Sequence, residues 1–122
     1  MTVEPLDQDD PNEPFLVDIQ EAALGAIRLT RGINRDAFAN DFELLSSVER
    51  SVQIIGRSAT FVDPALRDAH PEIPWRRLIG AARVLDDTDD ALEPDDLWAL
   101  LRDYPSMVRA IGALIPDEQT DW

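Results

Sequence analysis

The residues best suited to chemistry lie in the second half of the chain, where a histidine is followed by two arginines and then by a group of aspartates. His70 is the only histidine, and it begins the run His-Pro-Glu-Ile-Pro-Trp-Arg-Arg-Leu-Ile-Gly that ends at Gly80. General acid–base chemistry needs a base and an acid, and a phosphate group as substrate also needs cations beside it. Histidine and arginine supply these groups near neutral pH. His70 has no second base or nucleophile close to it in sequence, so we predict a surface or packing role for it.

The aspartate group occupies residues 86–90 and consists of Asp86, Asp87, Asp89 and Asp90. Negative charge at this density repels phosphate, and aspartate is a poor replacement for histidine as a base at neutral pH. Together with Glu93, these carboxylates could bind a divalent cation. The glycine and the final glutamate of an EF-hand loop are missing, however. We therefore predict a solvated turn that ends a helix, and we expect no metal and no cofactor.

Composition narrows the function classes further. The chain has 122 residues and no cysteine, which excludes disulfides, thiolate nucleophiles and cysteine-based zinc sites. Its formal net charge is -14, and all eleven basic residues are arginine. An acidic surface opposes nucleic acid at long range, so RNA is an unlikely partner. The acidity fits either a solvated surface or a patch that docks a basic partner, including a mimic of nucleic acid, and the sequence does not separate these interpretations.

Helical periodicity dominates the first half of the chain. A first helix is predicted from Glu13 to Arg31, with Gly32 as its stop. Asn34 should cap a short helix over residues 36–41 that buries Ala37 and Phe38. The longest helix is predicted over residues 41–63, because apolar residues recur there at three- and four-residue intervals without a proline. Gly56 lies on or beside the buried face of this helix, which indicates a close contact between helices.

Prolines divide the second half. Pro64, Pro71 and Pro74 bracket a predicted loop, and Pro74 is well placed as the first residue of a helix that ends in the aspartate group. Pro94 can begin a final helix, because the acidic residues that follow it favour a helix N-terminus. Pro105 should kink that helix.

These elements predict an all-α protein, an antiparallel four-helix bundle with one extra short helix. We expect residues 1–13 to form a disordered acidic tail, residues 14–115 to form the helical domain, and residues 116–122 to form a flexible C-terminal tail. No apolar stretch reaches about 18 residues, so no membrane span is predicted. The N-terminus lacks the basic and apolar regions of a secretory signal, and a cytoplasmic location is the default expectation.

Several of these segments, in the same order, resemble the HepT-like family of the HEPN group. The specific part is Ile73 to Gly80, and the resemblance extends from Phe15 to Ile115 through Gln53-Ile54-Ile55-Gly56 and through Trp98 ahead of Asp103-Tyr104-Pro105. Such proteins are small and all-helical, and many are RNA-cleaving toxins. The resemblance therefore implies the same helical fold and a connection to ribonucleases.

The resemblance also implies where a catalytic motif should lie. In the family, an arginine is followed by four spacer residues, a histidine, one spacer and a tyrosine. Aligned on Trp75 and Trp98 without gaps, the arginine falls on Ala82, the next residue of the motif on Arg83, the histidine on Asp87 and the tyrosine on Asp89. A shift by one residue places the motif arginine on Arg83 but supplies neither histidine nor tyrosine. The motif is degenerate, so no catalytic residue is assigned.

Two functional hypotheses remain open. The preferred one is a HepT-like pseudoenzyme without ribonuclease activity, which acts through dimerisation and protein–protein contact in a toxin–antitoxin type of system. The resemblance implies a symmetric homodimer and a nucleotidyltransferase-like protein as candidate partner, with Trp75, Arg76 and Trp98 as candidate interface residues. The alternative is an active RNA endonuclease toxin with an altered site.

Overall fold

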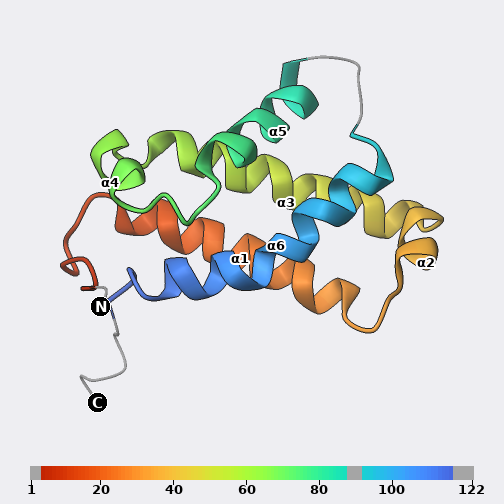
Figure 1. Ribbon diagram of the computed structural model, residues 1–122, viewed down its shortest axis with the longest axis horizontal. Coiled ribbons are helices and arrows are strands. Elements are labelled where there is room, and N and C mark those ends of the chain that lie inside the picture. The colour runs from red at the N-terminus through yellow and green to blue at the C-terminus, as the bar shows by residue number, and fades with distance from the viewer. Residues whose placement is uncertain (1–3, 88–91, 117–122) are drawn as a thin grey trace.

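The computed structural model describes residues 4–87 and 92–116 (Figure 1), and within these ranges the chain forms α-helices and no strand. The helices are α1 (Glu13–Thr30), α2 (Arg35–Ala39), α3 (Phe42–Phe61), α4 (Pro64–Ala69), α5 (Trp75–Asp87) and α6 (Pro94–Gly112). The all-α prediction is confirmed. Consecutive long helices run in opposite directions, as expected of an antiparallel bundle.

The ends of the helices follow the capping signals of the sequence. Asn34 accepts a hydrogen bond from the backbone N–H of Ala37 (2.8 Å) and begins α2, as predicted. Asp41 accepts one from Leu44 (3.2 Å) and begins α3 in the same way. The prediction that Ala37 is buried was wrong, since Phe38 fills the core position while Ala37 faces solvent. A helix this short presents only one side chain squarely to the core.

The predicted loop between Pro64 and Pro74 was wrong over its first six residues, which form α4. Asp63 accepts a hydrogen bond from the backbone N–H of Ala65 (3.1 Å), and Pro64 occupies the first turn of the helix. A proline at this position lacks only an N–H that a helix start leaves unbonded anyway. Pro64 therefore starts a helical turn here and does not merely interrupt the chain.

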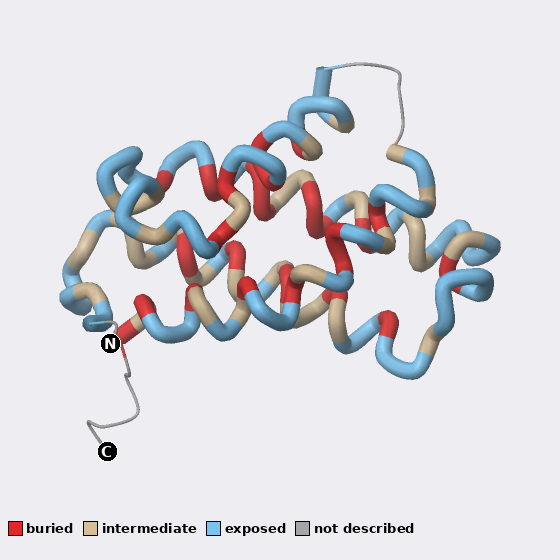
Figure 2. Tube along the Cα trace, viewed as in Figure 1, coloured by how far each residue is buried: buried red, intermediate tan, exposed pale blue. Residues whose placement is uncertain are grey.

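Helix α3 is the centre of the fold. It packs against α1 on one side and α5 on another, and α6 packs against both α1 and α3. Figure 2 shows the buried positions gathered where these four helices face one another. In α3 the buried apolar residues are Val48, Val52, Ile55 and Ala59. They belong to the stripe that the periodicity predicts, and their burial against α1 and α5 supplies hydrophobic stabilisation.

The two ends of the described chain meet beside α1 and α6. The backbone N–H of Leu6 donates a hydrogen bond to the carbonyl oxygen of Leu114 (2.8 Å), and the Leu6 side chain is half-buried against the core. Asn12 accepts a hydrogen bond from the backbone N–H of Asp63 (2.8 Å), which ties the start of α1 to the start of α4. Within the described residues, no helix is both long and apolar enough to cross a membrane.

Candidate functional site

Helix α5 carries three of the positions where the resemblance places a catalytic motif, Ala82, Arg83 and Asp87, and one face of the helix is buried. Ala82 is only 3% exposed and faces α3. A Cβ atom built on Gly56 would lie 2.2 Å from the Cβ of Ala82 and 2.8 Å from the carbonyl oxygen of Leu78. The two helices therefore meet at a point where no larger side chain fits. The close contact predicted for Gly56 is confirmed, and Ala82 is an interhelical packing residue.

Arg83 is the next residue along α5 and faces outward. It makes no ion pair with any residue in the ranges that the structure describes. Of the two positions that the alternative alignments give to a motif arginine, only position 83 leaves a guanidinium accessible. Figure 2 shows that the helix is mostly exposed from this point to its end.

The acidic end of α5 serves partly to join it to α3. Asp86 accepts hydrogen bonds from Gln53 (Nε2 to Oδ1, 3.1 Å) and from Arg57 (Nη2 to Oδ1, 3.2 Å). Asp87 is exposed and is the last residue of the helix, as the sequence predicts for a helix that ends in the aspartate group. Asp89 and Asp90 lie outside the described residues. Among the described side chains, no group of three or more candidate ligands could hold a metal ion.

His70 lies at the C-terminus of α4, away from these positions. Its Nδ1 is 3.4 Å from an oxygen of Glu72, and its carbonyl oxygen accepts a hydrogen bond from Trp75 Nε1 (3.0 Å). The side chain is half-buried. These contacts fix the loop between α4 and α5, which agrees with a packing role. In the described part of the chain, no arginine is paired with the imidazole.

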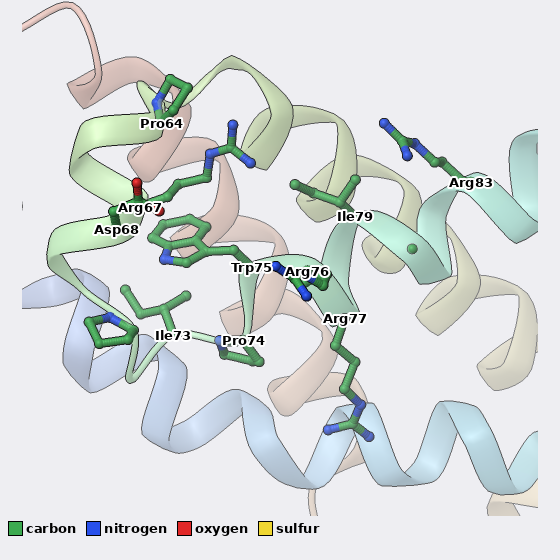
Figure 3. A pocket seen from close by; sticks show the side chains of 12 residues that line it. Pro64, Arg67, Asp68, Ile73, Pro74, Trp75, Arg76, Arg77, Ile79 and Arg83 are labelled. Atoms are coloured by element: carbon green, nitrogen blue, oxygen red, sulfur yellow. The ribbon is translucent and has the colours of Figure 1, made fainter.

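An open groove lies between α4, the following loop and α5, with a volume of about 820 Å³. We call it the arginine groove, because four of its lining residues are Arg67, Arg76, Arg77 and Arg83. Figure 3 shows the side chain of Arg67 extending from α4 toward α5, and that of Arg77 extending toward α6. Arg77 forms an ion pair with Asp103 of α6. Guanidinium groups stay charged at any physiological pH, so the groove is suited to bind anions.

The candidate interface residues take different places. Trp75 is 7% exposed and is mostly core, while Arg76 is exposed and lines the arginine groove. Trp98 is half-buried on α6, where its ring packs against that of Phe38 with the centroids 5.3 Å apart. The structure thus brings Trp75 and Arg76 to one groove and leaves Trp98 outside it.

Tyr104 is the one phenol of the chain, and it lies in the core of α6. Its hydroxyl group is 3.1 Å from Ser51 Oγ, and Ser51 donates its own hydrogen to the carbonyl oxygen of Val48 (2.6 Å). Tyr104 must therefore be the donor to Ser51. Burial raises the pKa of Tyr104 to about 12. A neutral, enclosed phenol of this kind holds α3 and α6 together and is not available to a ligand.

Arg67 was not predicted from the sequence to be a site residue. The signal was hidden because α4 was expected to be a loop, and only a helix places Arg67 on the same side as Arg76 and Arg83. What the described site offers chemically is a cluster of cations beside an apolar wall. It offers binding of a negative group, and the residues that line the groove do not include His70.

Comparison with protein families decides the classification. The model of the family described as "Ribonuclease HepT-like" matches residues 19–114. The chain belongs to the HepT-like family. The match extends from within α1 to the end of α6, and it confirms the resemblance carried by Ile73 to Gly80.

Curated relatives of this HepT-like protein carry ribonuclease names. One from Methanocaldococcus jannaschii, named "Putative RNase", is 26% identical over 98 residues, which cover 80% of this chain and 90% of the relative. One from Thermococcus cleftensis, named "Probable ribonuclease HepT", is 32% identical over 100 residues, covering 79% of this chain and 88% of the relative. No solved structure is similar enough to the chain to count as a match.

Proposed function

We propose that this HepT-like protein does not cleave RNA and acts through protein–protein contact as a symmetric homodimer. The observation that carries the proposal is the burial of Ala82 against Gly56, together with an aspartate at position 87. An arginine and a histidine at these two positions would be the phosphate clamp and the proton carrier of the family motif. An alanine packed against a neighbouring helix can do neither, and Asp87 adds negative charge where a phosphate would have to lie.

The retained helices give such a protein a use without catalysis. A homodimer could form through the surfaces that the family uses, and a mixed dimer with an active relative would dilute that relative's activity. A nucleotidyltransferase-like protein of a toxin–antitoxin type of system is the other candidate partner. Asp89 has no phenol for nucleotide addition, and Tyr104 is buried, which leaves protein contact as the form of control.

Expression in a bacterial host tests the proposal. We expect normal growth and intact cellular RNA on full induction, and a dimer mass by light scattering at micromolar concentration. Growth arrest with RNA fragmentation would contradict the silent function, and a monomer mass would contradict the homodimer. The two measurements are independent, so the absence of RNA cleavage and the homodimer are tested separately.

A second candidate function is an RNA endonuclease with an altered site. It is favoured by the ribonuclease names of the relatives and by the accessible Arg83 at the edge of the arginine groove. In this case a carboxylate of the aspartate group would have to replace the missing histidine. Cleavage that disappears in Asp87→Ala or in Asp89→Ala would establish this function. Cleavage that survives both substitutions would exclude that arrangement.

A further inference from the structure

The arginine groove is an exception to the charge of the rest of the molecule. The chain has a net charge of -14 and only eleven basic residues, yet four of them line this one groove. Asp68 is the only acidic residue among the lining residues. The groove is therefore richer in cations than the chain as a whole, in which acidic residues outnumber basic ones by 25 to 11. A concave cationic surface surrounded by negative charge favours a small or confined anionic group.

Three of these arginines are not used by the fold's own ion pairs. Arg77 is paired with Asp103, but Arg67, Arg76 and Arg83 form no ion pair with a residue in the described ranges. The Nε atom of Arg67 is also buried with no hydrogen-bond partner among the described atoms. A buried guanidinium nitrogen without an acceptor costs free energy, and a ligand can supply that acceptor only if the Arg67 side chain moves. Arg76 and Arg83 are exposed, so their guanidinium groups can meet an anion from outside.

The walls of the groove distinguish between kinds of anion. Pro64, Pro71 and Pro74 contribute apolar surface. The Trp75 ring is only 7% exposed, and its Nε1 is already bonded to His70. Binding of single-stranded RNA uses exposed aromatic faces on which bases stack, and this groove offers none of useful size. An RNA strand that continued beyond the groove would also meet the acidic surface around it. Carboxylates spaced by apolar side chains match both the arginines and the walls.

We propose that the arginine groove is the docking surface for an acidic, partly apolar peptide segment of a partner protein. Carboxylates of the segment pair with Arg76 and Arg83, a further acceptor lies near the half-buried Arg67, and apolar side chains lie along Pro71 and Pro74. The volume of about 820 Å³ lies in the range of sites that enclose several side chains. This inference rests on the proposed function, because a protein that acts through contact needs a face for its partner. The test of the groove measures peptide binding, whereas the test of the proposed function measures RNA cleavage and growth. Either proposal can therefore fail without the other.

The experiment is a fluorescence anisotropy titration of the full chain with a labelled peptide of about eight residues that alternates glutamate and leucine, which reaches about 26–29 Å when extended. The matched probes are the same peptide with glutamine for glutamate and a single-stranded oligouridylate. The double variant Arg76→Gln/Arg83→Gln tests the groove. Arg28→Gln/Arg50→Gln removes the same charge from exposed helix surfaces outside it. Arg67→Gln is measured separately, and thermal unfolding confirms that each variant is folded.

We expect the glutamate peptide to bind, the glutamine peptide to bind about tenfold more weakly, and the groove variant to lose about tenfold in affinity while the control variant loses less than about twofold. Arg67→Gln should weaken binding in the same direction. No binding of the glutamate peptide, or equal losses in the groove and control variants, would overturn the proposal. Tighter binding of oligouridylate at the groove would also overturn it, in favour of RNA. A wild-type dimer that dissociates in the groove variant and resists the peptide would assign the groove to a second copy of the chain.

Discussion

Gly56 of α3 and Ala82 of α5 meet so closely that a Cβ atom on the glycine would lie 2.2 Å from that of the alanine. This contact sets the spacing of the central helix and the helix that carries the motif positions. It also explains why position 82 holds an alanine. A glycine facing an alanine lets two helix backbones approach, and the close packing around them gains dispersion energy.

Substitution of Gly56 by alanine should therefore destabilise the protein despite the higher helix propensity of alanine. We expect a loss of about 1–3 kcal/mol in the free energy of unfolding, because α3 and α5 must separate to admit the methyl group. Gly25 is the matched control, since it lies in α1 and a Cβ atom added to it would have nothing within 4 Å. Gly25→Ala should stabilise the protein by about 0.5–1 kcal/mol. Urea denaturation measures both, and a stabilised Gly56→Ala variant would contradict the contact.

Restoring an arginine at the gapless motif position should fail for the same reason. Ala82→Arg must bury a charge or push the helices apart, and we expect a loss of about 3 kcal/mol or more in the free energy of unfolding. Ala99→Arg, at an exposed position of α6, should change the free energy of unfolding by less than about 0.5 kcal/mol. Thermal unfolding of the two variants distinguishes them. Equal stability would mean that position 82 opens to the surface and can accommodate a motif arginine.

The alkaline titration of this protein should report on one residue. The chain contains no lysine and no cysteine, and Tyr104 is its one tyrosine, so no other ordinary side chain ionises between pH 10 and 12. The pKa of Tyr104 is about 12 in the folded state against 10.0 as the ordinary value. The unfolded chain therefore loses its proton first, and stability falls as the pH rises through this interval. The free energy of unfolding should fall by about 2–3 kcal/mol between pH 10 and pH 12.

Urea denaturation at several alkaline pH values, together with tyrosinate absorbance, checks this expectation. Tyr104→Phe should remove the pH dependence of the free energy of unfolding between pH 10 and pH 12. At neutral pH it should lower that free energy by about 1 kcal/mol, because Ser51 keeps its bond to Val48 and loses the one from Tyr104. A tyrosinate signal that appears near the ordinary pKa in the folded protein would show that the phenol is not enclosed.

The long helices and the Gly56 contact could be predicted from the sequence because local signals determine them. Apolar residues at helical spacing define the buried face of α3, and Asn34 and Pro94 mark the starts of α2 and α6 with side-chain and backbone chemistry that acts within a few residues. The arginine groove could not be predicted in this way. Arg67 and Arg83 lie on different helices, and they share a groove only because α4 turns back beside α5. Sequence patterns describe each helix, but not which outward faces the packing brings together.

The positions of the degenerate motif could be predicted only in part from the sequence. Sequence alignment alone leaves the motif arginine on either Ala82 or Arg83, and the fold separates the two by burying the first and exposing the second. Neither alignment recovers a histidine. The register therefore stays open, and the loss of the histidine, which both alignments share, is what the proposed function depends on.

The most direct measurement is an RNA cleavage assay with the purified full-length protein, using end-labelled single-stranded RNA at neutral pH with and without added magnesium. Catalytic amounts of a homologue bearing a ribonuclease name serve as the positive control. Our account predicts intact RNA after prolonged incubation at stoichiometric protein. Multiple-turnover cleavage by the wild-type chain that is lost in Arg83→Ala and kept in Arg28→Ala would contradict it.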